Sequence, residues 1–126
     1  MNIFLFLGGI TGFLSVALGA FGAHALEGQI NENLLSTWQT AVRYLMFHTA
    51  ALLAVGILKI RYPGLSILSW AGWLFVIGII LFSGSLFILS VTGAGGLGFI
   101  TPVGGVTFMI AWILLAIGAL KMKNQY

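Results

Sequence analysis

The segment LSILSWAGWLFVIGIILFSGSLFILSV, residues 65–91, decides the fold class because it contains no charged residue. A helix that crosses a membrane needs roughly 20 predominantly apolar residues. The apolar run in this segment is continuous rather than alternating, which excludes the strands of a membrane β-barrel. We therefore predict a transmembrane helix over residues 65–91.

Three other segments have the same character, and they cover about residues 3–26, 38–58 and 103–120. Of all 126 residues, 60% are hydrophobic and only 6% are charged, whereas about 25% of the residues in a soluble domain are charged. This composition excludes both a soluble globular protein and a disordered one. We predict an all-α integral membrane protein, a four-helix bundle in which residues 1–126 form a single transmembrane domain.

The few basic residues are unevenly placed. Lys59 and Arg61 lie between the second and third segments, and Lys121 and Lys123 follow the fourth. With four spans, all four residues lie on one side, and loops rich in Lys and Arg face the cytoplasm. Both termini are therefore predicted to be cytoplasmic. The net charge of +3 comes from only five scattered basic residues, so no nucleic-acid partner is expected.

Capping patterns predict where two of the helices begin. Ser36 and Gln39 have the spacing of a capping box at the start of the second helix. Thr101 and Pro102 fit the N-cap and the first residue of the fourth helix. Between the third and fourth helices, the glycine-rich residues 93–98 leave two possibilities open. They either lie in the membrane interface or enter the bilayer where protein shields their backbone.

Small residues predict where helices approach closely, since helix association in lipid depends on close contact. In the first helix they recur at alternating spacings of four and three, and this glycine stripe consists of Gly8, Gly12, Ser15, Gly19 and Gly22. In the third helix the small residues are consecutive: Ser83, Gly84 and Ser85. We expect the glycine stripe to receive a neighbouring helix of the same bundle. An interface between subunits of an oligomer is the alternative.

Polar side chains within a membrane are costly, so the few present are the candidate binding residues. They are His24, Glu27, Arg43, Tyr44 and His48. Arg43 is expected about 7–8 Å inside the outer boundary of the bilayer. Three roles are open for it: reaching the headgroups, pairing with Glu27, or holding a lipid phosphate or another anion.

The second helix is expected to turn its polar side, with Arg43, Tyr44 and His48, toward the bundle. His48 should lie near the midplane as a neutral ring hydrogen-bonded to a neighbour, with proton relay or ligand contact as the functional alternative. His24 is expected to bond a backbone group or a serine. The chain has two acidic residues and no cysteine, so no metal site, cofactor or catalytic residue is expected.

Several motifs resemble one family of small membrane proteins. They are residues 19–26 (GAFGAHAL), residues 82–86 (FSGSL), residues 101–105 (TPVGG) with Trp112, and Thr40-Ala41, Tyr44, His48 and Ala51-Leu52 in the second helix. In this order they resemble domain-of-unknown-function family 423 (DUF423, also UPF0382), which is similar to the eukaryotic transmembrane protein 256. Two positions depart from its pattern, because Phe87 replaces a tyrosine, with loss of its hydroxyl, and Ala111 replaces a glycine. The resemblance implies a multi-pass protein of the bacterial cytoplasmic membrane and implies no activity.

Three functions are consistent with these residues. The first is a non-enzymatic bundle that binds membrane lipids, a membrane-protein partner or further copies of itself. The second is a small transporter or proton-conducting oligomer that uses Arg43, Tyr44 and His48. The third is an enzyme linked to a quinone or a lipid, with Tyr44 and His48 as hydrogen-bonding groups.

Overall fold

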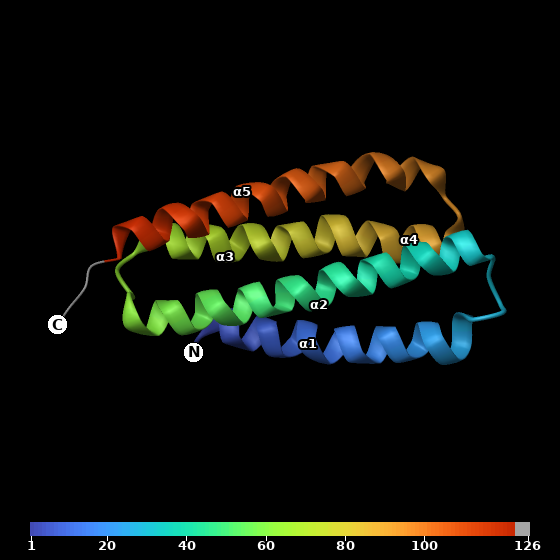
Figure 1. Ribbon diagram of the computed structural model, residues 1–126, viewed down its shortest axis with the longest axis horizontal. Helices are drawn as coiled ribbons and strands as arrows, with labels where there is room; N and C mark the ends of the chain where they lie inside the picture. Colours follow the sequence, from blue (N-terminus) through green and yellow to red (C-terminus); the bar gives the residue numbers. More distant parts are fainter. Residues whose placement is uncertain (123–126) are drawn as a thin grey trace.

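The computed structural model describes residues 1–122, which form helices and no strand. Four helical rods run alongside one another in an antiparallel arrangement (Figure 1). Each rod is long and apolar enough to cross a membrane: Ile3–Leu26, Glu32–Arg61, Ser66–Thr92 and Gly95–Lys121. The prediction of an all-α, four-helix membrane bundle is therefore confirmed. Lys123, one of the predicted cytoplasmic residues, lies outside the described residues.

Three of the four rods change helix type along their length. In chain order the elements are α1 (Ile3–Phe21), the π-helical η1 (Gly22–Leu26), α2 (Glu32–Arg61), α3 (Ser66–Gly78), the π-helical η2 (Ile79–Gly84), α4 (Ser85–Thr92), the 3₁₀-helical η3 (Gly95–Phe99) and α5 (Ile100–Lys121). The first and third rods lie within a residue of the predicted segments. The second and fourth begin earlier than residues 38 and 103, and the second also continues past residue 58.

The predicted start of the second helix is wrong. The side chain of Asn31 accepts a hydrogen bond from the backbone N–H of Leu34 at 2.8 Å, so Asn31 is the N-cap of α2. Ser36 already lies inside this helix and caps nothing. With 30 residues, α2 is about 45 Å long, which exceeds the hydrocarbon thickness of about 30 Å. The helix is therefore longer than the apolar part of a bilayer requires.

The predicted cap of the fourth helix is also wrong, because α5 continues from η3 without a side-chain cap. The Thr101 hydroxyl instead lies 2.6 Å from the Ser85 hydroxyl and joins α5 to α4. The backbone at Gly93 has a φ of 67°, which ends α4 in a left-handed turn. Residues 93–98 are exposed apart from the half-buried Leu97. The shielding that a segment inside the bilayer requires is therefore missing here.

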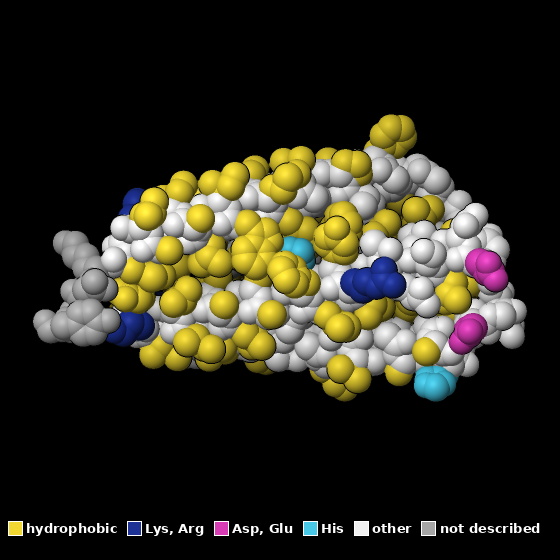
Figure 2. Space-filling view, viewed as in Figure 1, with side chains coloured by type: hydrophobic (Ala, Val, Ile, Leu, Met, Phe, Trp, Pro, Cys, Tyr) yellow, Lys and Arg dark blue, Asp and Glu magenta, His cyan; other side chains and the backbone are white. Residues whose placement is uncertain are grey.

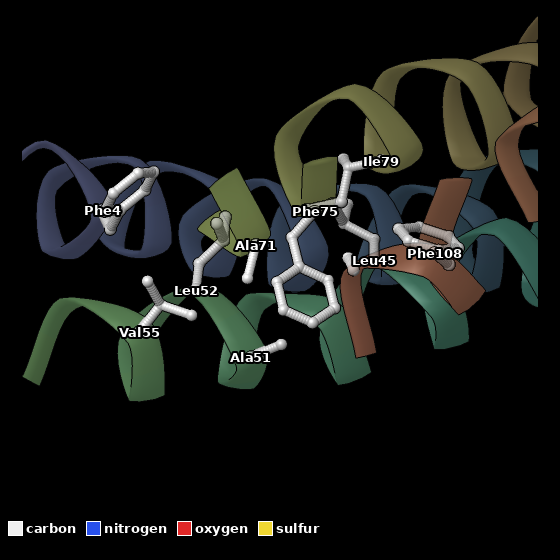
Figure 3. Close-up of a cluster of buried hydrophobic side chains, with 10 residues drawn as sticks. Phe4, Leu45, Ala51, Leu52, Val55, Ala71, Phe75, Ile79 and Phe108 are labelled. Atoms are coloured by element: carbon white, nitrogen blue, oxygen red, sulfur yellow. The ribbon is translucent and has the colours of Figure 1, made fainter. Parts of the chain in front are cut away.

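The core lies where α2 and the third rod meet, with α1 on one side and α5 on the other (Figure 1). Figure 3 shows Phe75 of α3 among side chains from α2, η2 and α5. The labelled core residues are Phe4, Leu45, Ala51, Leu52, Val55, Ala71, Phe75, Ile79 and Phe108. Both α2 and the third rod contact each of the other rods, so these two form the centre of the bundle.

The glycine stripe of α1 lies against α2 of the same chain. A Cβ added at Gly8 would come within 2.6 Å of the Leu53 side chain. One added at Gly22 would come within 2.6 Å of the Trp38 ring, whose N–H donates to the Leu18 carbonyl at 2.9 Å. Because both positions leave no room for a methyl group, the stripe is occupied within the bundle.

The small residues of the third rod have different surroundings. The Ser83 hydroxyl is buried and donates to the Ala41 carbonyl of α2 at 2.9 Å. Gly84 makes no close approach, since a Cβ there would have nothing within 4 Å. The third rod is approached closely by α5 at Gly104, where a Cβ would lie 2.5 Å from the backbone nitrogen of Phe82.

Candidate functional site

A groove with a volume of about 650 Å³ lies between α2 and α5, with η2 behind it. Its lining consists of Arg43, Tyr44, Phe47, His48, Phe82, Gly105, Phe108, Met109 and Trp112. Pockets that bind small molecules typically have volumes of about 300–1,000 Å³. Figure 2 shows this face of the molecule, with hydrophobic side chains around a histidine that lies in a hollow. We call this feature the α2–α5 groove.

Helical spacing explains how the groove is formed. Its α2 residues are two adjacent pairs one turn apart, so they share one side of the helix. The α5 residues Gly105, Phe108, Met109 and Trp112 are spaced as i, i+3, i+4 and i+7, which also places them on one face. The sequence analysis did not identify this α5 face as part of a site, although the spacing alone would have revealed it.

His48 forms the floor of the groove and is only 3% exposed. Its Nδ1 lies 2.8 Å from the Tyr44 carbonyl oxygen, which can only accept, so Nδ1 carries the proton. Its Nε2 accepts from the indole N–H of Trp112 at 3.1 Å. The ring also stacks on Phe108, with 3.6 Å between centroids and 7° between planes. His48 is therefore a neutral, hydrogen-bonded ring, as predicted, and both of its nitrogens are engaged within the bundle.

Arg43 and Tyr44 lie at the end of the groove nearer the α1–α2 connection. Both side chains are exposed, and the Tyr44 ring packs on Phe82 with 4.3 Å between centroids. Among residues 1–122, no side chain forms an ion pair or hydrogen bond with Arg43. The guanidinium, with its five N–H donors, is therefore available to a ligand.

The predicted pairing of Arg43 with Glu27 is wrong. Gly19 lies opposite Val42, because a Cβ on that glycine would contact Val42 at 3.4 Å. Glu27 comes eight residues after Gly19, which places it about 12 Å further along the bundle axis than Arg43. Glu27 is exposed at the end of η1 and does not reach the groove.

His24 also lies away from the groove. It is exposed on η1, and the described part of the chain offers its ring no hydrogen-bond partner, so the predicted bond to a backbone group or a serine is wrong. Of the five candidate binding residues, the fold brings together Arg43, Tyr44 and His48. Within residues 1–122, no three His, Cys, Asp or Glu side chains lie close enough together to hold a metal ion.

The predicted orientation of α2 needs correction too. Arg43 and Tyr44 are exposed, while the opposite side with Val42, Leu45 and Leu52 is buried. This orientation arises because the apolar side of α2 packs on the glycine stripe of α1 and on the third rod. Of the three residues on the polar side of α2, only His48 is buried. The groove is therefore open at the surface of the bundle rather than enclosed by it.

These features define a class: four-helix integral membrane proteins with a groove between the second and fourth rods. The family model described as "Protein of unknown function (DUF423)" matches residues 18–105. The UPF0382 membrane protein YwdK of Bacillus subtilis is 50% identical over 121 residues, which cover 96% of this chain and 98% of that protein.

Two staphylococcal relatives extend this comparison. A UPF0382 membrane protein of Staphylococcus aureus is 46% identical over 124 residues, 98% of this chain and 100% of the relative. One from Staphylococcus epidermidis is 43% identical over the same shares of both chains. No solved structure matches significantly. The chain belongs to the DUF423 (UPF0382) family of membrane proteins, for which no function is established.

Proposed function

We propose that this protein is a non-enzymatic membrane bundle that binds a lipid in the α2–α5 groove. The observation that carries the proposal is the groove itself, with an aromatic lining and one cationic side chain, Arg43, at one end. A hydrocarbon chain would lie against Phe108, Met109 and Trp112, and the polar end of the lipid would point toward Arg43. The proposal requires no cofactor, no metal and no chemical step.

The geometry of His48 favours lipid binding over proton conduction or quinone chemistry. Proton relay through this ring would first have to break its bond to Trp112 or to the Tyr44 carbonyl. A quinone oxygen would find neither a ring N–H nor a lone pair free on His48. The transporter and enzyme hypotheses therefore have less support than binding.

We also propose that both termini face the cytoplasm of a bacterial cell membrane. Support comes from the charges: Lys59, Arg61 and Lys121 lie at one end of the rods, whereas both glutamates lie at the other (Figure 2). A C-terminal green fluorescent protein fusion should fluoresce, and a C-terminal alkaline phosphatase fusion should be inactive. An active phosphatase fusion would contradict this orientation. With both termini in the cytoplasm, the Arg43 end of the groove would face the outer leaflet.

Blocking the groove with a side chain tests lipid binding. A Cβ at Gly105 would lie 3.9 Å from the Phe82 ring, in ordinary van der Waals contact, so Gly105→Leu introduces its side chain into the groove without a clash at the Cβ. The matched control is Gly9→Leu on the exposed side of α1, where a Cβ meets nothing within 4 Å. Native mass spectrometry of gently purified protein should show a retained lipid in wild type and in Gly9→Leu, and none in Gly105→Leu. Equal retention in all three proteins would refute the proposal.

A further inference from the structure

A second, smaller cavity lies next to the α2–α5 groove, on the α1 side of Arg43. Its volume is about 220 Å³, and its lining consists of Gly19, Gly22, Ala23, Trp38, Gln39, Val42 and Arg43. The residues that α1 and η1 contribute are all glycine or alanine, which leaves the space open. We call this feature the α1–α2 notch. Arg43 is the residue that lines both the notch and the groove.

The polar groups of the notch that remain available come from one face of α2. Gln39 and Arg43 are four residues apart, so their side chains are neighbours on the helix surface. Both are exposed, and within the described residues neither donates or accepts a side-chain hydrogen bond. The Trp38 indole N–H is already engaged by the Leu18 carbonyl. Gln39 and Arg43 therefore supply the free side-chain donors of the notch.

We propose that the α1–α2 notch is the headgroup subsite of the lipid-binding groove and that it selects an anionic, phosphate-bearing lipid. This proposal rests on the proposed function and adds the chemical class of the lipid. The phosphate binds Arg43 and Gln39 at the notch, and one hydrocarbon chain continues into the α2–α5 groove. Gln39, which the sequence analysis assigned to a helix cap, becomes a binding residue.

The two donors favour a phospholipid headgroup over a fatty-acid carboxylate. In either anion, the guanidinium can bind both charged oxygens in bidentate fashion. A phospholipid headgroup carries ester oxygens beyond these two, to which the Gln39 amide can donate, whereas a fatty acid carries none. No acidic side chain competes nearby: Glu27 lies about 12 Å further along the axis, and Glu32 about 16 Å from Arg43 along α2.

The depth of Arg43 also fits a lipid headgroup. Its Cα lies about 27 Å along α2 from Arg61, close to the hydrocarbon thickness of about 30 Å, which places Arg43 near the opposite interface. Helical side chains lean toward the N-terminus of their helix. The guanidinium of Arg43 therefore extends toward Gln39 and the interface, where lipid phosphates lie, while the groove continues toward the middle of the bilayer.

Lipid competition tests this assignment. The protein is reconstituted in vesicles with equal parts of dioleoyl phosphatidylglycerol, dioleoyl phosphatidylcholine and oleate, and the retained lipid is read by native mass spectrometry. Wild type should retain phosphatidylglycerol in preference to the zwitterionic lipid and to oleate. Arg43→Gln should lower that retention about tenfold, the effect expected for losing hydrogen bonds to a charged group. Gln39→Leu should reduce the preference for phosphatidylglycerol over oleate. The matched control is Lys59→Gln, which removes one charge from the opposite end of α2. It should change neither the retention of phosphatidylglycerol nor the preference for this lipid over oleate.

The outcomes separate the two proposals. If Gly105→Leu releases the lipid but Arg43→Gln behaves like Lys59→Gln, the groove binds lipid and the headgroup assignment is wrong. Equal retention of oleate and phosphatidylglycerol by wild type also overturns the assignment, as does displacement of the lipid by excess sodium phosphate, which would indicate a site for the free anion. If no lipid is retained at all, both proposals fail. Arg43 and Gln39 are exposed, so their variants should fold normally, and far-ultraviolet circular dichroism checks this.

Discussion

Trp112→Phe should reveal how strongly one hydrogen bond connects α2 to α5. The substitution keeps an aromatic ring against Phe75, whose centroid lies 4.8 Å from that of Trp112, but removes the indole N–H. The Nε2 of His48, a side chain only 3% exposed, then loses its donor at 3.1 Å. A buried acceptor left without a partner costs about 1–3 kcal/mol. Coupling energies of hydrogen bonds between membrane helices are smaller, on average about 0.6 kcal/mol and at most about 1.7 kcal/mol.

A double-mutant cycle isolates this interaction. Trp112→Phe and His48→Phe should each destabilise the protein, and the double variant should lose less than the sum by about 0.6–1.7 kcal/mol. The free energy of unfolding is measured by titration with sodium dodecyl sulfate in mixed micelles, followed by circular dichroism. Trp70→Phe, at a residue that is 66% exposed, is the control and should show no coupling with His48→Phe. If the two core substitutions are additive to within about 0.3–0.5 kcal/mol, the hydrogen bond does not hold the groove together.

Two further pairs of variants test packing and capping by the same unfolding titration. Gly104→Ala should destabilise the bundle by about 1–3 kcal/mol through overpacking, because its Cβ would lie 2.5 Å from the Phe82 backbone, whereas Gly105→Ala should not. Equal unfolding midpoints for Gly104→Ala and Gly105→Ala would contradict the close approach of α5 to η2. Asn31→Ala should cost about 1 kcal/mol and speed amide exchange in the first turn of α2, while Ser36→Ala should change neither. If Ser36→Ala destabilises the protein and Asn31→Ala does not, the capping box predicted at Ser36 is correct.

The number and approximate position of the spans were predictable because they depend on composition and spacing. An uncharged apolar run identifies a membrane helix without any tertiary contact. The glycine stripe of α1 was visible in the same way, and it faces α2. The orientation of α2 was not predictable. Its polar side suggested an inward face, but the apolar side of α2 packs on α1 and on the third rod, so Arg43 and Tyr44 lie at the surface. A rule that places polar residues inside fails when the polar group can reach the membrane interface.

The back of the α2–α5 groove depends on a feature that apolar periodicity does not reveal. The π-helical η2 interrupts the third rod, so the residues after it do not continue the α-helical register. Two hydrogen bonds anchor this region, one from the Ser83 hydroxyl to the Ala41 carbonyl of α2 and one between the Ser85 and Thr101 hydroxyls.

Directly before the first of these anchors, η2 presents Phe82 to the groove, where its ring packs on Tyr44. Crossing a membrane requires only a regular helix, whereas π-helical turns occur frequently at functional sites. The interruption that shapes the groove therefore favours a binding role for it over a purely structural one.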